Sequence, residues 1–551
     1  MKSTKIAIVI VTVFISIILV GFFNNSGDIY FSISRNMELF GRIYKEISFN
    51  YVEEINPEEF LKAAIRGMLS TLDPYTIFID EDQKDDIELI TNGKYGGVGI
   101  TIGVRGEDVT VVEVLDGYSA QKQGLRIGDI LIEAAGKKIS PENIDEISSL
   151  VKGDAGTTVD LTILRNDKQD TIRFSLIREE VIVKNLAFYG FYPENSNNVY
   201  IKLTNFSRSA GEELRNAIKE LKQIKPIESI VFDLRGNPGG LLDVAVDISN
   251  KFLPKGLLVV TTKGRDEKEE KVYYASQEPL VPDTRLVVLI NGSSASASEI
   301  VAGAIQDHDR GIILGTHSFG KGLVQTIVPL SYNSSLKITT AKYFTPSGRS
   351  IQKINYGDKN KVFSRKDSMK INSYKTDNER IVFSGGGITP DSTVRFEIEG
   401  EITKQLLAKG LFFKFADHYY YKNSRLDYKS LKDDSILKAF EDFVAEDNFH
   451  FHSEAEKQIE KLISDLENKK SNDKLREELS HVRKQLEELE SAELKIYNKE
   501  ILREIKSELI MRYLGTEAQT KELLNFDTQF QAALNIVSDS ELYRKILKKR
   551  E

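Results

Sequence analysis

Residues 286–300 read LVVLINGSSASASEI, an apolar run followed by a turn of small residues. The apolar run predicts a buried strand that ends at Ile290. The pattern after it predicts a helix that begins near Ser298. Ser296 therefore lies in a strand-to-helix turn, where its hydroxyl stands at the end of a sheet beside the free backbone N–H groups of the helix start.

The segments around this stretch alternate between strand and helix patterns. Strands are predicted at 199–203, 229–234, 258–260, 286–290 and 312–314, and helices at about 209–223, 242–252 and 298–306. This order predicts an α/β domain with a largely parallel sheet. Ligands in such sheets bind at the carboxyl ends of the strands, which is where Ser296 and the glycine-rich turn after Leu234 stand.

Lys321, 25 residues after Ser296, is the candidate base for that serine. A lysine accepts a proton only when it is uncharged, and a free lysine has a pKa of about 10.4, which apolar surroundings lower. Gln325 follows four residues later, a spacing that suits one face of a helix or strand, and its amide can orient the amine. Taken singly, Ser296 reads as a helix cap and Lys321 as a surface charge. Together, in an α/β context, they favour a serine–lysine hydrolase.

Residues 315–322, GTHSFGKG, also match most of a phosphate-binding loop. Gly322 stands at the position where that loop needs a Ser or Thr to reach Mg²⁺. We therefore expect no nucleotide site.

A second glycine-rich turn, residues 235–242 (RGNPGGLL), follows another predicted strand. Its glycines let backbone N–H groups point into a cleft, and an acyl-transfer enzyme needs such donors for the developing oxyanion. We expect the amides of Gly240 and Ala297 to supply them. The alternative is an ordinary strand-to-helix turn. Glu299 either orients neighbouring groups or is a favourable acid in the first turn of its helix.

A β-rich module precedes the α/β domain. Strand patterns at 98–102, 109–114, 130–132 and 159–164, with a short helix at 144–151, place it between about Tyr95 and Ile177. The glycines of residues 95–100 (YGGVGI) predict a loop whose amides hold a terminal carboxylate, beside a strand edge that adds an extended peptide. The alternatives are an ordinary tight turn at these glycines and, for Arg126, a surface charge. The peptide-binding candidates are Gly97, Val98, Gly99, Ile100 and Arg126.

The N-terminus carries an apolar run of 18 residues, Ile6 to Phe23, behind Lys2 and Lys5. This length just spans a membrane, and no small-residue cleavage site follows, so we expect an uncleaved anchor rather than a cleaved signal peptide. The lysines put the N-terminus in the cytoplasm and the rest of the chain outside. Helices are then expected from about residue 36 to 70, with Asn56 as an N-cap.

Composition excludes several classes of protein. The chain of 551 residues is too long for one core, and its net charge of −8 gives no sign of nucleic-acid binding. The absence of cysteine excludes disulfides and a thiol nucleophile. His450 and His452 lie close together, but this is a weak metal signal, so we expect no metal and no cofactor.

The C-terminal part shifts to Lys, Glu and Leu after about Gly400, and residues 455–514 read as long charged helices. Apolar residues at coiled-coil spacing cover about three heptads: Leu475, Leu479, Val482, Leu486 and Leu489. Three arrangements stay open, namely a coiled coil, a helical hairpin and a helix that packs one face on the core.

Taken together, these motifs resemble the C-terminal processing peptidase family, serine–lysine endopeptidases with an embedded PDZ domain. The resemblance covers roughly residues 35–395, and Tyr118 stands where the PDZ signature usually has a small residue or proline. Its motifs are residues 72–75, 95–100, 119–129, 233–240, 292–299, 319–325, 345–349 and 387–391.

The resemblance implies the roles of the site residues. Ser296 is the nucleophile, Lys321 the general base and Gln325 its positioning partner, while Gly240 and Ala297 supply the oxyanion amides. The PDZ domain recognises the C-terminal tail of a protein substrate, and cleavage follows nearby, outside the cytoplasm. The alternative is an inactive PDZ scaffold that binds protein C-termini.

We therefore expect a multidomain α/β protein whose α/β serine peptidase core carries an inserted β-rich PDZ domain, N-terminal helices with a membrane segment, and a C-terminal helical extension. The expected boundaries are 1–24 for the membrane anchor or signal segment, 25–84 for the helical region, 85–178 for the PDZ domain, 179–395 for the peptidase core and 396–551 for the extension. The expected partners are protein substrates with exposed C-terminal tails and, through the N-terminal segment, a membrane. We expect the protein to be membrane-anchored or secreted, with its catalytic part outside the cytoplasm, in the periplasm. Oligomerisation is left open.

Overall fold

The computed structural model describes residues 27–81, 88–89, 91–165, 170–354, 356, 371–395, 400–425, 427–447, 449, 451–468 and 473–548. The chain forms two compact units, one ending at Phe78 and the other beginning at Ile79. The predicted anchor, Ile6 to Phe23, lies outside the described residues. Within the described ranges, no helix has both the length and the apolar character needed to cross a membrane.

The described residues of the first unit include the helices α2 (Gly27–Asn50) and α3 (Pro57–Leu69). The predicted cap is confirmed, since the Asn56 side chain accepts hydrogen bonds from the N–H groups of the first turn of α3. The ring of Tyr44 stacks on Phe60 with 5.8 Å between centroids, which joins the two helices.

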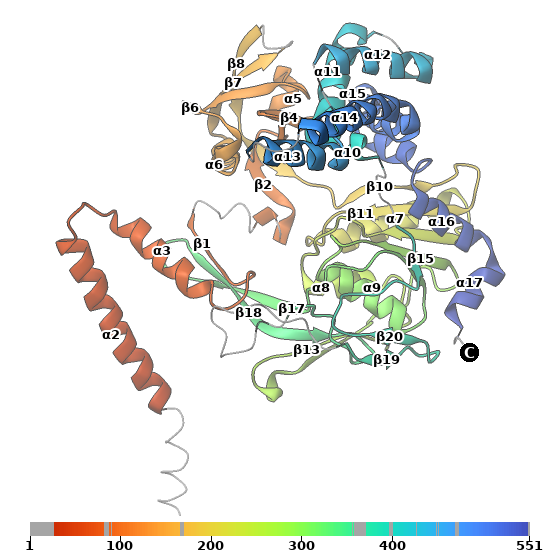
Figure 1. The fold of residues 1–551 in the computed structure, drawn as a ribbon. Coiled ribbons are helices and arrows are strands. Elements are labelled where there is room, and N and C mark those ends of the chain that lie inside the picture. Colours follow the sequence, from red (N-terminus) through yellow and green to blue (C-terminus); the bar gives the residue numbers. More distant parts are fainter. Residues whose placement is uncertain are drawn as a thin grey trace, which may run out of the picture. The chain divides into compact units, whose positions relative to one another are not determined.

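A central sheet organises the second unit (Figure 1). Its strands lie in the order β10 (Leu186–Phe191), β11 (Asn198–Leu203), β12 (Ser229–Asp233), β15 (Arg285–Ile290), β16 (Ile312–Gly315) and β21 (Ser392–Thr393). From β11 to β21 every neighbouring pair is parallel, and β10 runs antiparallel to β11. The predicted, largely parallel sheet is confirmed, except that the strand predicted at 258–260 does not belong to it and lies in a second, antiparallel sheet.

Helices cover both faces of this sheet. One face packs against α7 (Ala210–Ile224), α8 (Leu242–Ser249) and α9 (Ala297–Asp307). The other face packs against α16 (Thr528–Ser538) and α17 (Ser540–Leu547). Successive strand residues point to opposite faces, so Val288 joins the first core and Val287 the second. The packing of α16 and α17 on the sheet is not a feature that we predicted.

A second, antiparallel sheet was also missed by the sequence analysis. In it β18 (Ser335–Phe344) pairs with both β13 (Leu258–Lys263) and β17 (Leu323–Pro329), and β13 pairs with β14 (Lys271–Tyr274). Most positions of β17 are partly or fully exposed, which leaves no apolar alternation for a sequence pattern to detect. Lys321 lies two residues before β17 begins.

The β-rich module has its own sheet and core. Its strands lie in the order β3 (Ile100–Arg105), β4 (Asp108–Val114), β5 (Ile130–Ala134), β7 (Thr158–Arg165) and β8 (Asp170–Ile177). The helices α5 (Ser119–Gln123) and α6 (Ile144–Val151) complete it. The strand β2 (Lys94–Gly97), which precedes this sheet in the chain, pairs with β9 (Glu179–Ile182), which follows it.

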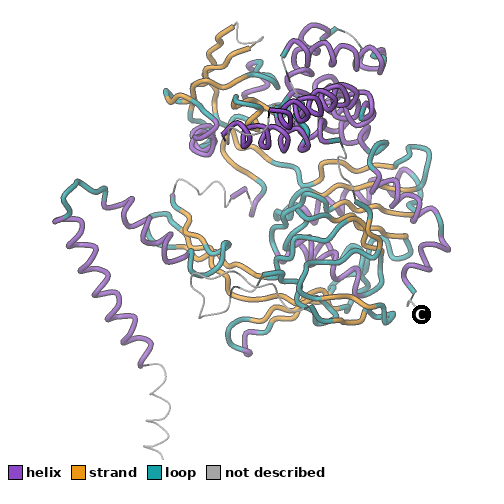
Figure 2. Tube along the Cα trace, viewed as in Figure 1, coloured by secondary structure: helices purple, strands orange, loops and turns teal. Residues whose placement is uncertain are grey.

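In its described residues, the C-terminal part before α16 consists of helices joined by loops (Figure 2). It contains α10 (Glu401–Ala408), α11 (Leu411–Asn423), α12 (Asp433–Glu446), α13 (Glu454–Asn468), α14 (Asp473–Ile496) and α15 (Asn498–Leu523). The helices α10, α11, α12 and α15 share a core built around Phe412, Phe415, Phe440 and Ile505. Of the three arrangements left open, the structure shows a helical hairpin, since α13 packs against α14.

Candidate active site

Ser296 has an unusual backbone conformation at the N-cap of α9. Its φ of 53° and ψ of −111° fall outside the regions that residues with a side chain usually occupy. The Ser296 N–H donates to a carboxylate oxygen of Glu299 at 2.8 Å, and its carbonyl accepts from the Tyr343 hydroxyl at 3.1 Å. Both sides of the strained residue are thus held, as is common where a turn aims a functional side chain.

The Glu299 carboxylate joins the serine turn to the lysine segment. Its Oε2 accepts from the N–H groups of Ser296 and Lys321, at 2.8 and 3.0 Å. Its Oε1 accepts from the Ser318 hydroxyl and the Gly320 N–H, at 2.5 and 2.7 Å. Burial raises the pKa of Glu299, and these hydrogen bonds lower it part of the way back. Glu299 fills both roles considered for it, since it lies in the first turn of α9 and its hydrogen bonds orient its neighbours.

Lys321 lies on the segment that leads into β17, and Gln325 lies within that strand. Lys321 is partly buried, and the bond to Glu299 ties its backbone to that of Ser296. The Gln325 amide donates to the Thr339 hydroxyl on β18 at 3.3 Å. The structure therefore brings the backbones of the predicted nucleophile and base to a single carboxylate.

The glycine-rich turn after β12 lies directly against the serine turn. A Cβ on Gly239 would stand 2.9 Å from both the Ser296 Cβ and the Ala297 nitrogen. Gly240 forms a parallel bridge with Phe206 that uses the carbonyl of Gly239 and the N–H of Leu241. The N–H of Gly240 takes no part in this bridge. Ala297 is the first residue of α9, whose N–H has no partner within the helix.

The candidate peptide-binding loop is buried from Gly97 to Ile100. The carbonyl of Val98 accepts from the N–H of Ala120 at 3.0 Å, and Gly99, with φ of 81°, packs against Tyr118. In the described part of the chain β3 pairs with β4 alone, so its other edge is open for a further strand.

Arg126 lies apart from that loop, in the turn before β5. Its side chain is exposed, and its backbone N–H donates to the Asp129 carboxylate at 2.8 Å. Among the described residues, no hydrogen bond or ion pair is seen between the Arg126 side chain and residues 97–100.

Sequence reasoning missed a polar cluster behind the glycine-rich turn. The Arg235 guanidinium contacts Asp233 at the end of β12 and also Asp527 and Gln529 at the start of α16. Burial alone would raise the pKa of Asp233, but Arg235 beside it brings the pKa below its ordinary value. Because 292 residues separate Arg235 from Asp527, no local pattern signals this pairing.

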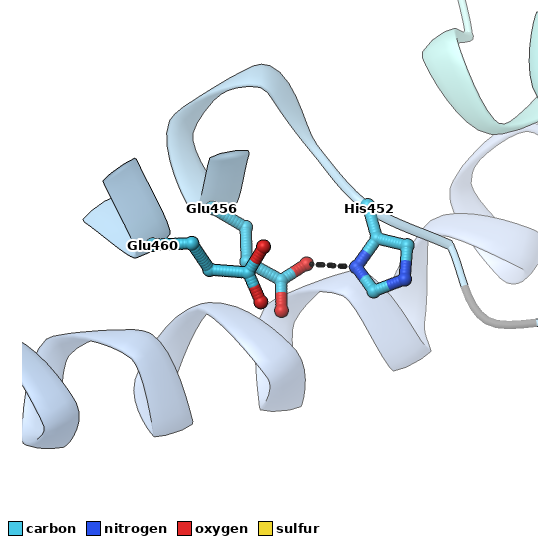
Figure 3. A group of neighbouring side chains, drawn as sticks. All are labelled: His452, Glu456 and Glu460. Atoms are coloured by element: carbon cyan, nitrogen blue, oxygen red, sulfur yellow. Dashed lines mark hydrogen bonds and ion pairs between the residues drawn. The ribbon is translucent and has the colours of Figure 1, made fainter. Parts of the chain in front are cut away.

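A group with the residue types of a metal site lies in the helical part (Figure 3). The ligand atoms of His452, Glu456 and Glu460 lie within 4.8 Å of one another, and His452 Nδ1 is 2.9 Å from Glu456 Oε2. Arg483 faces both carboxylates at 3.6 Å, so they already have a cation beside them. His450 lies outside the described residues.

The chain matches four known domain families. Residues 197–357 match peptidase family S41, and residues 110–165 match the PDZ domain. Residues 24–83 match the N-terminal domain of the activating protease CtpB, and residues 402–537 match a C-terminal helical domain of probable PDZ-proteases.

Individual relatives agree with these matches. The chain is 38% identical over 334 residues to a carboxy-terminal-processing protease of Bartonella bacilliformis, covering 60% of this chain and 75% of that protein. It is 31% identical over 354 residues to a probable CtpA-like serine protease of Staphylococcus aureus, covering 63% and 69%. A solved photosystem II D1 C-terminal processing protease matches 65% of this chain and 92% of its own, with 25% identity and a TM-score of 0.36.

The domain matches define a serine protease with an α/β peptidase core, a PDZ domain and a C-terminal helical domain. The chain belongs to the carboxy-terminal processing protease family, within peptidase family S41.

Proposed function

We propose that this protease cleaves protein substrates near a C-terminal tail held by its PDZ domain, with Ser296 as nucleophile and Lys321 as general base. The observation that carries the assignment is that the buried Glu299 carboxylate accepts hydrogen bonds from the backbone N–H groups of both residues. A dyad needs its two members in fixed relation, and a hydrogen-bond acceptor shared by their backbones supports this pairing.

The chemistry proceeds through an acyl-enzyme. The Ser296 oxygen bonds to the scissile carbonyl carbon while its proton passes to the uncharged Lys321 amine. The oxyanion receives hydrogen bonds from the N–H groups of Gly240 and Ala297. The intermediate collapses as the C–N bond breaks, and the leaving amine takes the proton from Lys321. Water then adds to the ester by the same route and restores the serine. Gln325 orients the lysine.

Substrate tails are proposed to enter the PDZ domain at the loop formed by Gly97, Val98, Gly99 and Ile100. The open edge of β3 supports this, because an extended peptide can add there as a further strand. Arg126 is proposed as a cation that meets the substrate outside that loop, since its side chain is exposed.

The location is also a proposal. We propose that residues 6–23 anchor the chain in a membrane, or direct its secretion, with the protease domains in the periplasm. The support is the apolar run behind two lysines.

The catalytic assignment is tested with a substrate protein that ends in an exposed apolar tail. Ser296→Ala and Lys321→Ala should each lower kcat by about 10³-fold or more. Ser293→Ala, an exposed serine of the same turn, should match wild type. The wild-type rate should rise with pH between about 5 and 9, because the lysine acts only when it is uncharged. Equal rates for wild type and Ser296→Ala would reject the assignment and favour a PDZ scaffold.

A further inference from the structure

We infer that the C-terminal helix α16 positions the glycine-rich turn of residues 235–242, called the oxyanion turn below, through Arg235. Asp527 and Gln529 are then positioning residues for peptide cleavage. The inference rests on the proposed function, because it takes the Gly240 N–H as a donor to the oxyanion. It assigns a role in catalysis to a segment more than 230 residues beyond the nucleophile.

The Arg235 guanidinium is held by acceptors on two elements. It reaches Asp233 through Nε at 2.9 Å and Nη2 at 2.6 Å. It reaches Asp527 through Nη2 at 2.6 Å and Nη1 at 3.0 Å, and Gln529 through Nη1 at 2.9 Å. A guanidinium has five N–H donors in a rigid fork, and these five contacts use all of them. The orientation of Arg235 is therefore set jointly by β12 and α16.

The α16 side of this contact is itself anchored. Asp527 caps the helix by accepting from the N–H of Phe530 at 3.0 Å. The Phe530 ring packs edge-on against Tyr200 of β11, with centroids 5.2 Å apart, and the Tyr200 hydroxyl donates to Asp233 at 2.7 Å. The Gln529 amide donates to the carbonyl of Val394 at 2.6 Å. The start of α16 is thus fixed to the sheet rather than merely adjacent to it.

The other end of the turn meets the nucleophile. The carbonyl of Asn237 accepts from the Ala295 N–H at 3.1 Å and from the Ser298 hydroxyl at 3.0 Å. Gly239 then approaches Ser296 so closely that a Cβ would collide with it. The turn is held by α16 at Arg235 and by the start of α9 beyond it. Loosening the first attachment shifts the N–H of Gly240 relative to Ser296.

The charges make Asp527 the suitable residue to change. Two carboxylates, the buried Asp233 and the partly buried Asp527, share one guanidinium, so replacing Asp527 leaves Arg235 with a charged partner. Asn caps helices about as well as Asp, so Asp527→Asn keeps the start of α16 while it weakens the fork. Replacing Arg235 instead would bury two carboxylates without their cation.

The experiment compares Asp527→Asn with Asp539→Asn in the full chain. Asp539 is the matched control, since it caps α17 in the same way but, among the described residues, forms no hydrogen bond or ion pair with Arg235. Asp527→Asn should lower kcat about tenfold and leave KM within about twofold, because the loss falls on transition-state stabilisation. A peptide aldehyde, whose adduct with Ser296 places an oxyanion in the same position, should bind about tenfold more weakly. Asp539→Asn should behave as wild type in all three measurements.

A second variant guards against a general loss of folding. Gln529→Met removes one acceptor without changing charge, and it should lower kcat by a smaller factor with KM unchanged. The inference is overturned if Asp527→Asn matches Asp539→Asn in kcat and aldehyde binding, or if KM rises while kcat stays constant. If Ser296→Ala also cleaves at the wild-type rate, it is the proposed function that has failed.

Discussion

Ser296 illustrates how this chain stabilises a strained residue. A non-glycine residue at φ of 53° costs about 1–3 kcal/mol and persists only where its surroundings determine it. Here the surroundings are Glu299, which takes the N–H of Ser296, and Tyr343, which donates to its carbonyl. The same Glu299 also takes the N–H of Lys321. One side chain thus fixes the conformation of the proposed nucleophile and the path of the segment that carries the proposed base.

Glu299→Gln should destabilise the protein and lower its activity. A carboxylate accepts at both oxygens, whereas an amide would turn its NH2 group toward two of the present donors. Leaving two buried donors unsatisfied costs about 2–5 kcal/mol in the free energy of unfolding. We expect kcat to fall about tenfold or more, since the backbones of Ser296 and Lys321 lose their common acceptor. Chemical denaturation and steady-state kinetics measure the two effects. A variant as stable and as active as wild type would remove Glu299 from this role.

The same variant should change how stability depends on pH. Burial raises the pKa of Glu299, so the folded chain binds this proton more tightly than the unfolded chain. The corresponding stability is present below about pH 4.3 and is lost as the pH rises through the raised pKa. The difference in unfolding free energy between wild type and Glu299→Gln, measured by denaturation at several pH values, should therefore decrease as the pH rises. A difference that does not change between about pH 4 and 8 would contradict it.

At the scale of elements, the site lies where two loops meet at the ends of β12 and β15. The loop after β12 carries the oxyanion turn, and the loop after β15 carries Ser296 and leads into α9. They meet without room for a side chain, since a Cβ on Gly239 would stand 2.7 Å from the carbonyl oxygen of Ala295. Parallel neighbouring strands bring their carboxyl ends to one edge, which is why residues of separate loops can touch there.

Gly239→Ala should separate the proposed oxyanion turn from Ser296, the proposed nucleophile. Its φ of 103° and its contacts with the backbone of the serine turn leave no space for a methyl group. We expect kcat to fall about 100-fold, comparable to the loss of one oxyanion donor. Gly236→Ala is the control, because Gly236 also has a positive φ, 74°, but has open space around its Cβ. It should cost about 1–2 kcal/mol of stability and little activity. Equal kcat for the two variants, measured on one substrate, would argue against this geometry.

At the scale of the whole molecule, the peptidase sheet is completed by the end of the chain. After β21 the chain builds a helical domain with its own core and then returns to cover the second face of the sheet with α16 and α17. That face includes Tyr200, Val287 and Leu314, which would otherwise be exposed to water. The helices α16 and α17 therefore belong to the folded core of the peptidase and not to the helical domain before them.

Phe530→Ala should destabilise the peptidase core. Phe530 is 1% exposed and packs against Tyr192 and Tyr200, so its truncation should cost about 3–5 kcal/mol in the free energy of unfolding. Phe526, four residues earlier, is 39% exposed, and Phe526→Ala should cost much less. Thermal unfolding followed by circular dichroism, with peptidase activity recorded in parallel, checks both. If Phe530→Ala unfolds at the wild-type temperature, α16 is not part of the peptidase core.

The amino-acid sequence by itself determined the parallel strands, the start of α9 near Ser298 and the Asn56 cap, because apolar runs, turn residues and caps are local signals. It also singled out the segments of Ser296, Lys321 and the glycine-rich turn. Tertiary structure alone decided the antiparallel sheet of β17 and β18, the cover of α16 and α17, the convergence of hydrogen bonds on Glu299 and the Arg235–Asp527 contact. These depend on half-exposed strands or on partners far apart in the chain, which meet only once the core has formed.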